Sequence, residues 1–316
     1  MSQDNPIDST EIKKTIIIPA LELPISPKRN IIWCSSFQLA WNKVAPIHIE
    51  NLENIIRFLN QTKVSEKDLE ASSYRVNVTF SNPDRLILDA FLKAELQFEH
   101  PFQDLRTGMD FIDSDGNRNR VKGFGIPYDQ SNSMGMAPIQ VTVLYKDAVS
   151  EQFILDLSSL TKPYQLIVAK IDLLDNLADT IGNLNSLISK QSGRGFLMPG
   201  NSLSVPNMDF HIQHDFRELE SGLIEIARQR VKFKLDRFGA ELESHADMKL
   251  LGVGSGEYNL DRPFLIIMKK RDCQRPFFVT WVDNAELLKP MKKSLFNKKV
   301  FVFAKICREF LFFNQK

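Results

Sequence analysis

Two strongly apolar runs near the C-terminus constrain the fold more than any other feature of this chain. The first covers residues 263–268, the second covers residues 276–282, and the charged sequence KKRDCQR joins them. Apolar runs of this length with a short charged connection are typical of a buried β-hairpin. The chain has 316 residues, of which 43% are hydrophobic. It is therefore long enough to bury a large core, in one large domain or two modest ones.

The stretch before this hairpin alternates between two kinds of residue. Val231, Phe233 and Leu235 share one face of VKFKL, as a half-buried strand requires. Residues 240–250 then alternate without a slip, which a loop has no reason to do. This segment is predicted to be a strand at least some of the time. One of its faces carries Ala240, Leu242, Ser244, Ala246, Met248 and Leu250, and the other carries Glu241, Glu243, His245, Asp247 and Lys249.

Charge and cysteine content exclude several classes of protein. The net charge is +1, from 40 basic and 39 acidic residues, so no global field favours nucleic acid or an anionic membrane. Cys34, Cys273 and Cys307 are too few and too scattered for a disulfide framework or a CxxC metal site. We expect them to be buried or surface thiols.

The N-terminal sequence MSQDNPIDSTEIKK is polar, and no apolar core precedes a small-residue cleavage site. No apolar run reaches the ~18 residues that span a bilayer, so no transmembrane segment is expected. A cytoplasmic location follows as the default, or an extracellular one if the sequence is already processed. Residues 1–14 are expected to be disordered or peripheral, because nothing in them can pack.

Catalysis finds little support in the sequence. The five histidines have no partnered nucleophile and no HExxH spacing. His211 and His214 lie three residues apart, and a metal site would need further ligands. The sequence GVGSG at residues 252–256 lacks the following helix and the Lys-Ser/Thr of a phosphate-binding loop, so loop flexibility is the better interpretation. We expect no enzyme activity, no cofactor and no metal.

Acidic residues near position 115 allow one further interpretation. Asp113, Asp115 and Asn117 are spaced like the first ligands of a calcium loop, but Val121 and Phe124 occupy the region where the final bidentate acid belongs. A hairpin turn is therefore favoured, in which a glycine at position 116 supplies a positive φ.

Periodicity predicts the remaining elements. Residues 30–41 pass from a short apolar strand into a helix, with Ser35 and Ser36 as the N-cap. Residues 86–98 are ambiguous between helix and strand. Further helices are predicted at 52–59 and 173–188, and further strands at 74–80, 141–145, 153–157 and 164–171.

The order of these features resembles the C-terminal signature of the serpins. A strand ending in Phe-Gly is followed by a loop, then by Asp-Arg-Pro-Phe-Leu, two core strands and Asn284. Phe98, Pro101 and Phe102 are similar to the residues that close the third strand of the large serpin sheet. Another strand of the family is resembled by Val205, Pro206 and Phe210.

This resemblance makes residues 86–98 a central strand. It implies an α+β, serpin-like fold with a large mixed or antiparallel central sheet and a C-terminal, β-barrel-like set of strands. Residues 1–28 are then a partly disordered extension, residues 29–288 the serpin-like domain, and residues 289–316 a basic, aromatic extension. Only residues 30–84 stand where the family has several helices and two strands. The helical cover of the sheet is therefore expected to be reduced, including the helix displaced when the loop inserts.

In the serpins the segment between this Gly and the Arg-Pro-Phe is the reactive centre loop. The resemblance thus implies a serine protease inhibitor: a serine protease or a cysteine protease cleaves the loop, whose first part inserts into the main sheet as a strand. The hinge residues would be Gly239, Ala240, Leu242, Ser244 and Ala246. The scissile region would be Leu251, Gly252, Val253 and Gly254.

The hinge also departs from the family, whose inhibitory members have mostly small residues there. Leu242, Glu243 and His245 break that habit. The alternative is a non-inhibitory serpin-like structural or binding protein, in which residues 240–250 are permanently part of the sheet. Neither interpretation implies a small-molecule substrate or nucleic acid.

The C-terminal extension is a partial exception. From Lys289 onward it contains eight Lys or Arg residues and one Glu. Phe303, Ile306, Phe310 and Phe313 have helical spacing, which fits either a basic amphipathic segment for an anionic surface or RNA, or a packed terminal helix with a solvated basic face.

Overall fold

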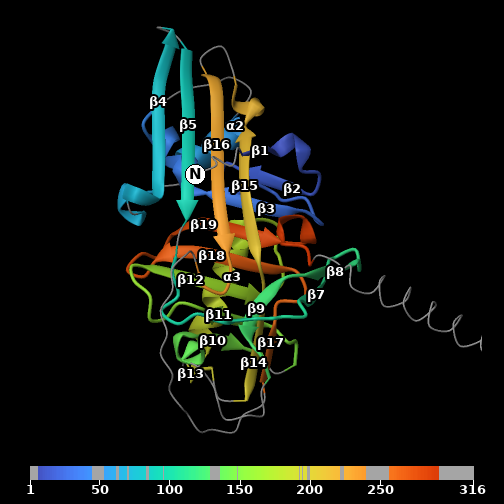
Figure 1. Ribbon diagram of the computed structural model, residues 1–316. Helices are drawn as coiled ribbons and strands as arrows, with labels where there is room; N and C mark the ends of the chain where they lie inside the picture. Colours follow the sequence, from blue (N-terminus) through green and yellow to red (C-terminus); the bar gives the residue numbers. More distant parts are fainter. Residues whose placement is uncertain are drawn as a thin grey trace, which may run out of the picture.

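A computed structural model describes most of the chain. The described residues are 6–44, 53–61, 64–69, 71–82, 85–94, 96–128, 136–147, 149–191, 193, 195–197, 200–220, 224–239 and 256–291. Two large sheets and two smaller ones make up this part of the chain (Figure 1). The expected α+β class with large sheets and few helices is confirmed.

A five-stranded mixed sheet forms the upper half of the molecule in Figure 1, with the strand order β1-β15-β16-β5-β4. Buried and partly exposed residues alternate along β16 from Ala227 to Leu235, as the VKFKL pattern predicts. The strand predicted within residues 86–98 is β5, which ends at Ala94 and lies next to the middle strand β16, so the choice of strand over helix is confirmed. The strands are β1 (Ile7–Asp8), β4 (Tyr74–Asn82), β5 (Arg85–Ala94), β15 (Met208–Asp215) and β16 (Ile224–Leu235).

An eight-stranded sheet lies below it, and the predicted hairpin occupies its interior. Every residue of β19 is buried, as an apolar run requires. The strand order is β13 (Gly195–Phe196), β10 (Thr142–Lys146), β11 (Phe153–Asp156), β12 (Tyr164–Lys170), β18 (Phe264–Lys270), β19 (Pro276–Val282), β3 (Asn30–Cys34) and β2 (Thr15–Ile18).

The remaining strands form a four-stranded sheet and a two-stranded hairpin. Among the described strands no sheet closes into a barrel, since even the eight-stranded sheet has two edge strands, β13 and β2, that each pair on one side only. The four-stranded sheet has the order β17 (Gly256–Asn259), β14 (Asn201–Pro206), β9 (Gly123–Ile126) and β6 (Gln103–Asp104), and the hairpin joins β7 (Met109–Ile112) to β8 (Arg118–Val121).

Three α-helices occur in the described part of the chain, at the three predicted places. α1 (Ser35–Asn42) is almost wholly buried and packs against β5 and β4. Its N-cap position is Cys34, without a side-chain cap, so the expected capping by Ser35 and Ser36 is wrong. The other two are α2 (Glu53–Gln61) and α3 (Leu177–Lys190). None of these three helices is long and apolar enough to cross a membrane. The 3-10 helices are η1 (Ser9–Glu11), η2 (Glu66–Asp68), η3 (Ala71–Ser73), η4 (Ala137–Gln140), η5 (Arg217–Leu219) and η6 (Ala285–Leu287).

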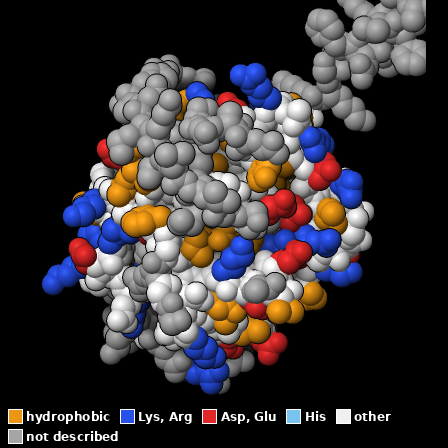
Figure 2. Space-filling view, turned by 90° about the horizontal axis from the view of Figure 1, so that it is seen from below, with side chains coloured by type: hydrophobic (Ala, Val, Ile, Leu, Met, Phe, Trp, Pro, Cys, Tyr) orange, Lys and Arg blue, Asp and Glu red, His pale blue; other side chains and the backbone are white. Residues whose placement is uncertain are grey.

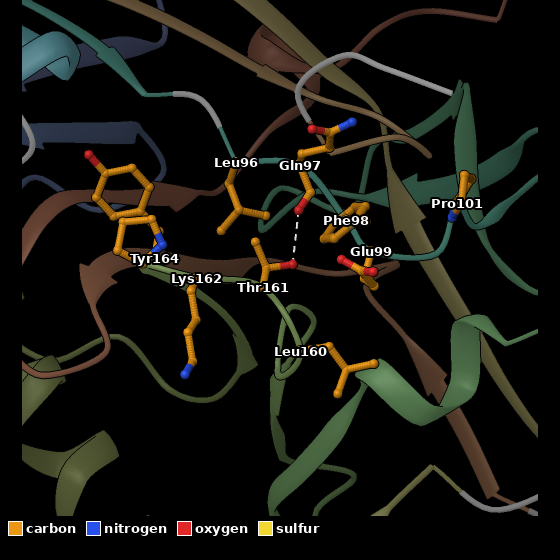
Figure 3. Close-up of a pocket in the computed structure, with 10 residues that line it drawn as sticks. Leu96, Gln97, Phe98, Glu99, Pro101, Leu160, Thr161, Lys162 and Tyr164 are labelled. Carbon is orange, nitrogen blue, oxygen red and sulfur yellow. Dashed lines mark hydrogen bonds between the residues drawn. The ribbon is translucent and has the colours of Figure 1, made fainter. Parts of the chain in front are cut away.

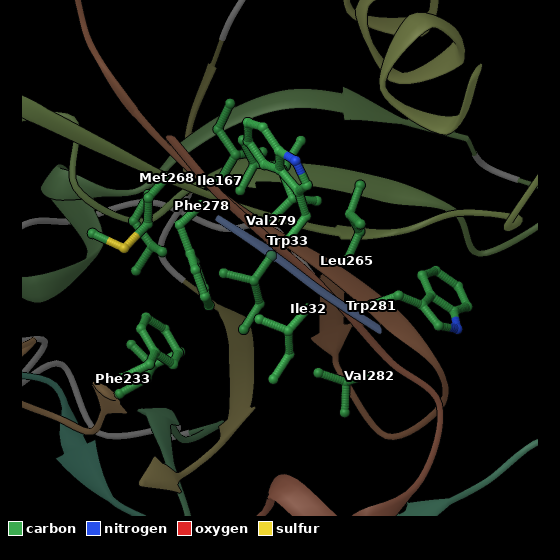
Figure 4. Close-up of a cluster of buried hydrophobic side chains, with 14 of the residues drawn as sticks. Ile32, Trp33, Ile167, Phe233, Leu265, Met268, Phe278, Val279, Trp281 and Val282 are labelled. Carbon is green, nitrogen blue, oxygen red and sulfur yellow. The ribbon is translucent and has the colours of Figure 1, made fainter. Parts of the chain in front are cut away.

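One hydrophobic cluster joins the two large sheets (Figure 4). Phe233 of β16 stacks on Phe278 of β19, with ring centroids 4.7 Å apart and an interplanar angle of 27°. Ile32 of β3 lies on the same face of its sheet as Phe278, Trp33 lies on the opposite face, and all four side chains are at least 98% buried. Because β16 packs directly on the hairpin, the position of the central sheet is set by the most apolar part of the sequence.

Residues 6–14 lie at the edge of the fold and are joined to it by backbone pairing. β1 pairs in parallel with β15, and β2 pairs in parallel with β3 at the edge of the eight-stranded sheet. Between them the carboxylate of Glu286 accepts hydrogen bonds from the backbone N–H groups of Lys13 and Lys14 and from the hydroxyl of Thr15. The expectation that nothing in residues 1–14 packs is therefore wrong for the described residues 6–14, because backbone pairing needs few apolar side chains.

Candidate functional site: the hinge beside the central strand pair

The centre of the upper sheet is a parallel pair of strands. β16 and β5 are direct neighbours over nine residue pairs, from Ile224 opposite Leu86 to Phe233 opposite Ala94. No strand can therefore lie between them. Residues 240–250 lie outside the described residues, so the alternative in which they are permanently part of the sheet stays a prediction.

A tight turn ends β16 and contains the predicted hinge glycine. The N–H of Gly239 donates to the carbonyl of Asp236 at 3.0 Å, and the N–H of Phe238 donates to Asp236 Oδ1, also at 3.0 Å. Gly239 has a φ of +80° and forms an antiparallel bridge with Gln97. A Cβ added to Gly239 would lie 2.2 Å from the carbonyl oxygen of Leu96. Only glycine fits this position without moving the backbone.

The chain that follows β5 holds this turn in place. The N–H of Phe98 donates to the carbonyl of Phe238 at 3.1 Å, and the N–H of Phe102 donates to the carbonyl of Arg237 at 2.9 Å. Phe98 and Phe102 are buried edge to face, with centroids 4.8 Å apart. The residues that resemble the end of the third serpin strand are thus the ones that fix where the chain leaves β16.

A cavity of about 400 Å³ lies next to the backbone hydrogen bonds that hold this turn (Figure 3). It separates residues 96–101 from residues 160–164, and a hydrogen bond of 2.9 Å from Thr161 Oγ1 to the carbonyl of Gln97 crosses between the two segments. Leu160, at one side of the cavity, is 44% exposed. Gln97, which pairs with Gly239, is therefore also held by the connection between β11 and β12.

On the buried face of the strand pair, a polar contact joins β16 to helix α1. The amide of Gln229 donates to Ser36 Oγ at 3.1 Å, and the Ser36 hydroxyl is 3.4 Å from Gln229 Oε1. Gln229 is 1% exposed and Ser36 is fully buried. Since a buried amide is costly to leave unpaired, this contact fixes β16 against the helix.

Ion pairs cross the other, solvent-facing side. Arg228 of β16 binds Asp215 of β15 through two hydrogen bonds of 2.7 and 3.0 Å, and this bonding raises the pKa of Arg228. Arg230 binds Asp89 of β5 through a single contact at 2.5 Å. The Nε atom of Arg230 and the Oδ1 atom of Asp89 are buried without a partner among the described atoms. The pair that bridges the two central strands is thus less completely satisfied than the one beside it.

Of the predicted site residues, the structure places Gly239. Residues 240–255 lie outside the described residues, and the chain resumes at Gly256 in β17, which runs parallel to β14. The residues outside the description are Ala240, Leu242, Ser244, Ala246, Leu251, Gly252, Val253 and Gly254. Those of the C-terminal extension beyond Met291 lie outside it too.

The acidic turn near position 115 is a hairpin turn, as predicted. Asp113 Oδ1 accepts the backbone N–H groups of Asp115 and Asn117 at 3.0 and 2.8 Å, and Gly116 has a φ of +82°. These hydrogen bonds engage the oxygen that a calcium ion would need.

The two neighbouring histidines do not converge. His211 and His214 differ by an odd number of positions along β15, so their side chains leave opposite faces of the strand. His214 Nδ1 is hydrogen-bonded to Ser9 Oγ at 2.8 Å, and burial lowers the pKa of His214. Within the described residues no group of three potential ligands can hold a metal ion.

The cysteines Cys34 and Cys273 are free thiols, and burial raises the pKa of Cys34 well above its usual value. Seen from below, the molecule carries Lys and Arg beside Asp and Glu, with hydrophobic side chains between them (Figure 2). Neither sign of charge dominates this face.

Sequence reasoning missed three parts of the site. The contact of Gln229 with Ser36, the ion pair of Arg230 with Asp89, and the pairing of Gln97 with Gly239 all join distant segments. Only the polar interruption of an apolar face at Gln229 was a signal in the sequence.

No protein-family model matches the chain, and no curated protein matches it in sequence. Several solved structures are similar to it. A highly specific serpin of the insect Tenebrio molitor is 13% identical with a TM-score of 0.39, covering 63% of this chain and 56% of that one. The mouse protein-Z dependent protease inhibitor is 15% identical with a TM-score of 0.44, covering 66% and 57%.

Human thyroxine-binding globulin, solved with its ligand, is 13% identical with a TM-score of 0.42, covering 65% and 58%. This chain thus spans little more than half the length of each of these structures. The similar structures are serpins, and they include protease inhibitors as well as a thyroxine-binding protein. Likenesses this distant carry no functional argument.

Proposed function

We propose that this protein is a serpin-like inhibitor of a serine or cysteine endopeptidase. The target protease cleaves the segment between Gly239 and Gly256, and the part that follows Gly239 enters the upper sheet between β5 and β16. The observation that carries this proposal is the direction of the two strands. β5 and β16 run parallel and both end beside Gly239. A strand that folds back from Gly239 would be antiparallel to both, and antiparallel pairing is the more stable arrangement.

Residues 240–250 are long enough to form a strand along the whole β5–β16 pair. We call the position that this strand would take between β5 and β16 the slot. Nine residue pairs at ~3.3 Å per residue give the slot a length of ~30 Å. The alternating residues 240–250 are enough to fill it.

The side chains of the segment also suit the slot. If the antiparallel bridge of Gln97 with Gly239 is continued along β5, Ser244 falls opposite Leu92 and Ala246 opposite Ala90. Leu92 and Ala90 are fully buried on the face that packs against α1. Small side chains in these two rows can enter without overfilling that interior. Leu242, the bulky exception, falls opposite the small Ala94.

The reduced helical cover supports the same proposal. In the described part of the chain, α1 is the helix that packs on the central strands, and it lies on their buried face. Opening the pair therefore requires no described helix to be displaced from the other face.

The proposal is tested by incubating the protein with a panel of serine and cysteine proteases. We expect at least one of them to form a complex that survives denaturation in SDS. The variant Ala246→Arg would bury a charge on insertion, so it should be cleaved without forming the complex. The matched control is His245→Arg, in which the introduced arginine would face solvent after insertion. This variant should still form the SDS-stable complex. If every protease merely cleaves or ignores the wild-type protein, the inhibitor proposal fails.

A second candidate is a non-inhibitory binding protein whose sheet stays closed. The ion pair of Arg230 with Asp89 favours it because it joins β16 to β5, and the contact of Gln229 with Ser36 favours it because it fixes β16 against α1, which also packs on β5. This candidate predicts that cleavage of the loop leaves the melting temperature unchanged with any protease.

A further inference from the structure

Strand β4 forms one edge of the upper sheet. Figure 1 shows it as the outermost strand on the side away from β16, and among the described strands it pairs only with β5. The pairing is regular from Tyr74 to Phe80 and shifts register between Phe80 and Asn82. The free side of an edge strand presents backbone N–H and C=O groups that a further strand can bind. Residues 74–80 therefore offer a regular edge for such pairing.

This edge lacks the features that usually keep edge strands apart. Monomeric proteins protect their edges with prolines, with several charged side chains, or with a bulge that twists the strand away. Residues 74–80 contain no proline and a single charge, Arg75. The register shift comes only after Phe80, at the end of the strand. Nothing in the sequence of residues 74–80 therefore opposes the addition of another strand.

The side chains of β4 form two rows that read alike in both directions from Asn77. The inner row has an aromatic residue at each end and two valines between them: Tyr74, Val76, Val78 and Phe80. The first three of these are half-buried against the core, whereas Phe80 is 66% exposed. The outer row is exposed and consists of Arg75, Asn77 and Thr79.

We propose that the free edge of β4 binds the same edge of a second copy of this chain. The two strands run antiparallel, and the two-fold axis passes through Asn77. In this register Tyr74 faces Phe80 of the second copy, and Val76 faces Val78. Each exposed Phe80 thus gains an aromatic neighbour on the inner face, and aromatic and β-branched pairs of this kind stabilise adjacent strands.

The symmetry of the two rows is the reason to choose a second copy over an unrelated strand. A two-fold interface requires that one patch be complementary to itself. On the inner face each residue type meets a residue of its own kind. On the outer face Arg75 meets Thr79, so the only charge of the edge never lies opposite its own copy, where like charges would repel.

This inference goes beyond the proposed function and does not depend on it. A strand that enters between β5 and β16 would leave the pairing of β4 with β5 intact, so the dimer should exist before and after cleavage. Because a single strand edge is a small interface, we expect a weak dimer that exchanges rapidly with the monomer.

The first test measures the dissociation constant of the whole protein by sedimentation equilibrium. Thr79→Arg places two arginine pairs across the interface, so the dimer should dissociate ~5-fold more readily. Thr79→Glu places a carboxylate opposite each Arg75 and should tighten the dimer by a similar factor. Both variants change the same exposed position, and equal melting temperatures in dilute solution show that the fold is kept.

The second test checks the register by cross-linking, in a background without Cys34, Cys273 and Cys307. Asn77→Cys places the two thiols next to each other on the two-fold axis, and mild oxidation should join the chains by a disulfide. Thr79→Cys is the matched control on the same face. Its two thiols are four residues apart along the strands, ~13 Å, and should cross-link far more slowly.

The outcomes decide the proposal directly. A wild-type protein that remains monomeric up to ~100 µM would overturn it, because even transient interfaces associate in that range. A dimer whose dissociation constant is the same in wild type, Thr79→Arg and Thr79→Glu uses another surface and would overturn it as well. Equal cross-linking of Asn77→Cys and Thr79→Cys would contradict the register around Asn77. Opposite shifts in the two Thr79 variants, together with selective cross-linking at position 77, would establish the dimer.

Discussion

Gly239 pairs with Gln97 in an antiparallel bridge at the point where the two parallel strands β5 and β16 both end. This bridge already has the register and direction that an inserted strand would need. The turn from Asp236 to Gly239 therefore sets both where the loop leaves the sheet and which of its residues would face the core.

Replacing Gly239 with alanine should destabilise the protein strongly. The new Cβ would have both a φ of +80° and a contact of 2.2 Å with the carbonyl oxygen of Leu96. We expect a loss of ~3 kcal/mol or more in the free energy of unfolding, measured by urea denaturation. Gly116→Ala is the matched control, because Gly116 has a φ of +82° but no atom within 4 Å of the added Cβ. It should cost only ~1 kcal/mol. Equal losses would mean that the backbone around Gly239 moves easily to make room for the added Cβ.

Replacing Gln229 with alanine should destabilise the packing of β16 against α1. The substitution removes a buried amide and leaves Ser36 Oγ without that partner, which costs ~1 to 3 kcal/mol. Thermal and urea denaturation measure the loss. Gln213→Ala on the solvent-facing side of β15 is the control and should change stability by less than ~0.5 kcal/mol. A loss of similar size in both variants would contradict the role of the buried contact.

The buried His214 should make stability depend on pH. Burial lowers its pKa in the folded state, and the carboxylates of Glu218, Asp215 and Asp8 partly offset this. Since the unfolded chain binds the proton more readily, stability is present above the unfolded pKa of ~6.5 and is lost as the pH falls below it. The melting temperature should therefore drop between pH 7 and pH 5.

The variant His214→Gln keeps a polar side chain at this position and should show a smaller drop. Ser9→Ala keeps the histidine and removes its hydrogen-bond partner, so its drop should persist. If His214→Gln and wild type lose the same number of degrees, other groups govern the acid side of the stability curve.

Local sequence patterns predicted most strands correctly. They could not predict which distant segments pair with each other. The alternation in VKFKL and the two apolar runs gave β16, β18 and β19, because a side chain's face and its burial are local properties. The turn at Gly116 followed from turn chemistry alone.

The parallel pairing of β5 with β16 joins segments more than a hundred residues apart, and the sequence of neither strand indicates its pairing partner. The short strand β1 was missed for a related reason. It is held by backbone hydrogen bonds and by Ser9 rather than by apolar side chains, so the sequence of residues 6–14 carries no signal of burial. The alternation of residues 240–250 remains a prediction, since these residues lie outside the described part of the chain.

The most direct test of insertion is a distance across the central pair before and after cleavage. Spin labels replace Asn77 of β4 and Gln213 of β15, on the solvent-facing side, in a background without Cys34, Cys273 and Cys307. A second pair, at Asn77 and Lys93, lies on one side of the slot and serves as the control. Cleavage within residues 251–254 should lengthen the first distance by one strand spacing, ~4.8 Å, and leave the second unchanged. A first distance that stays the same in fully cleaved protein would contradict the insertion of a strand between β5 and β16.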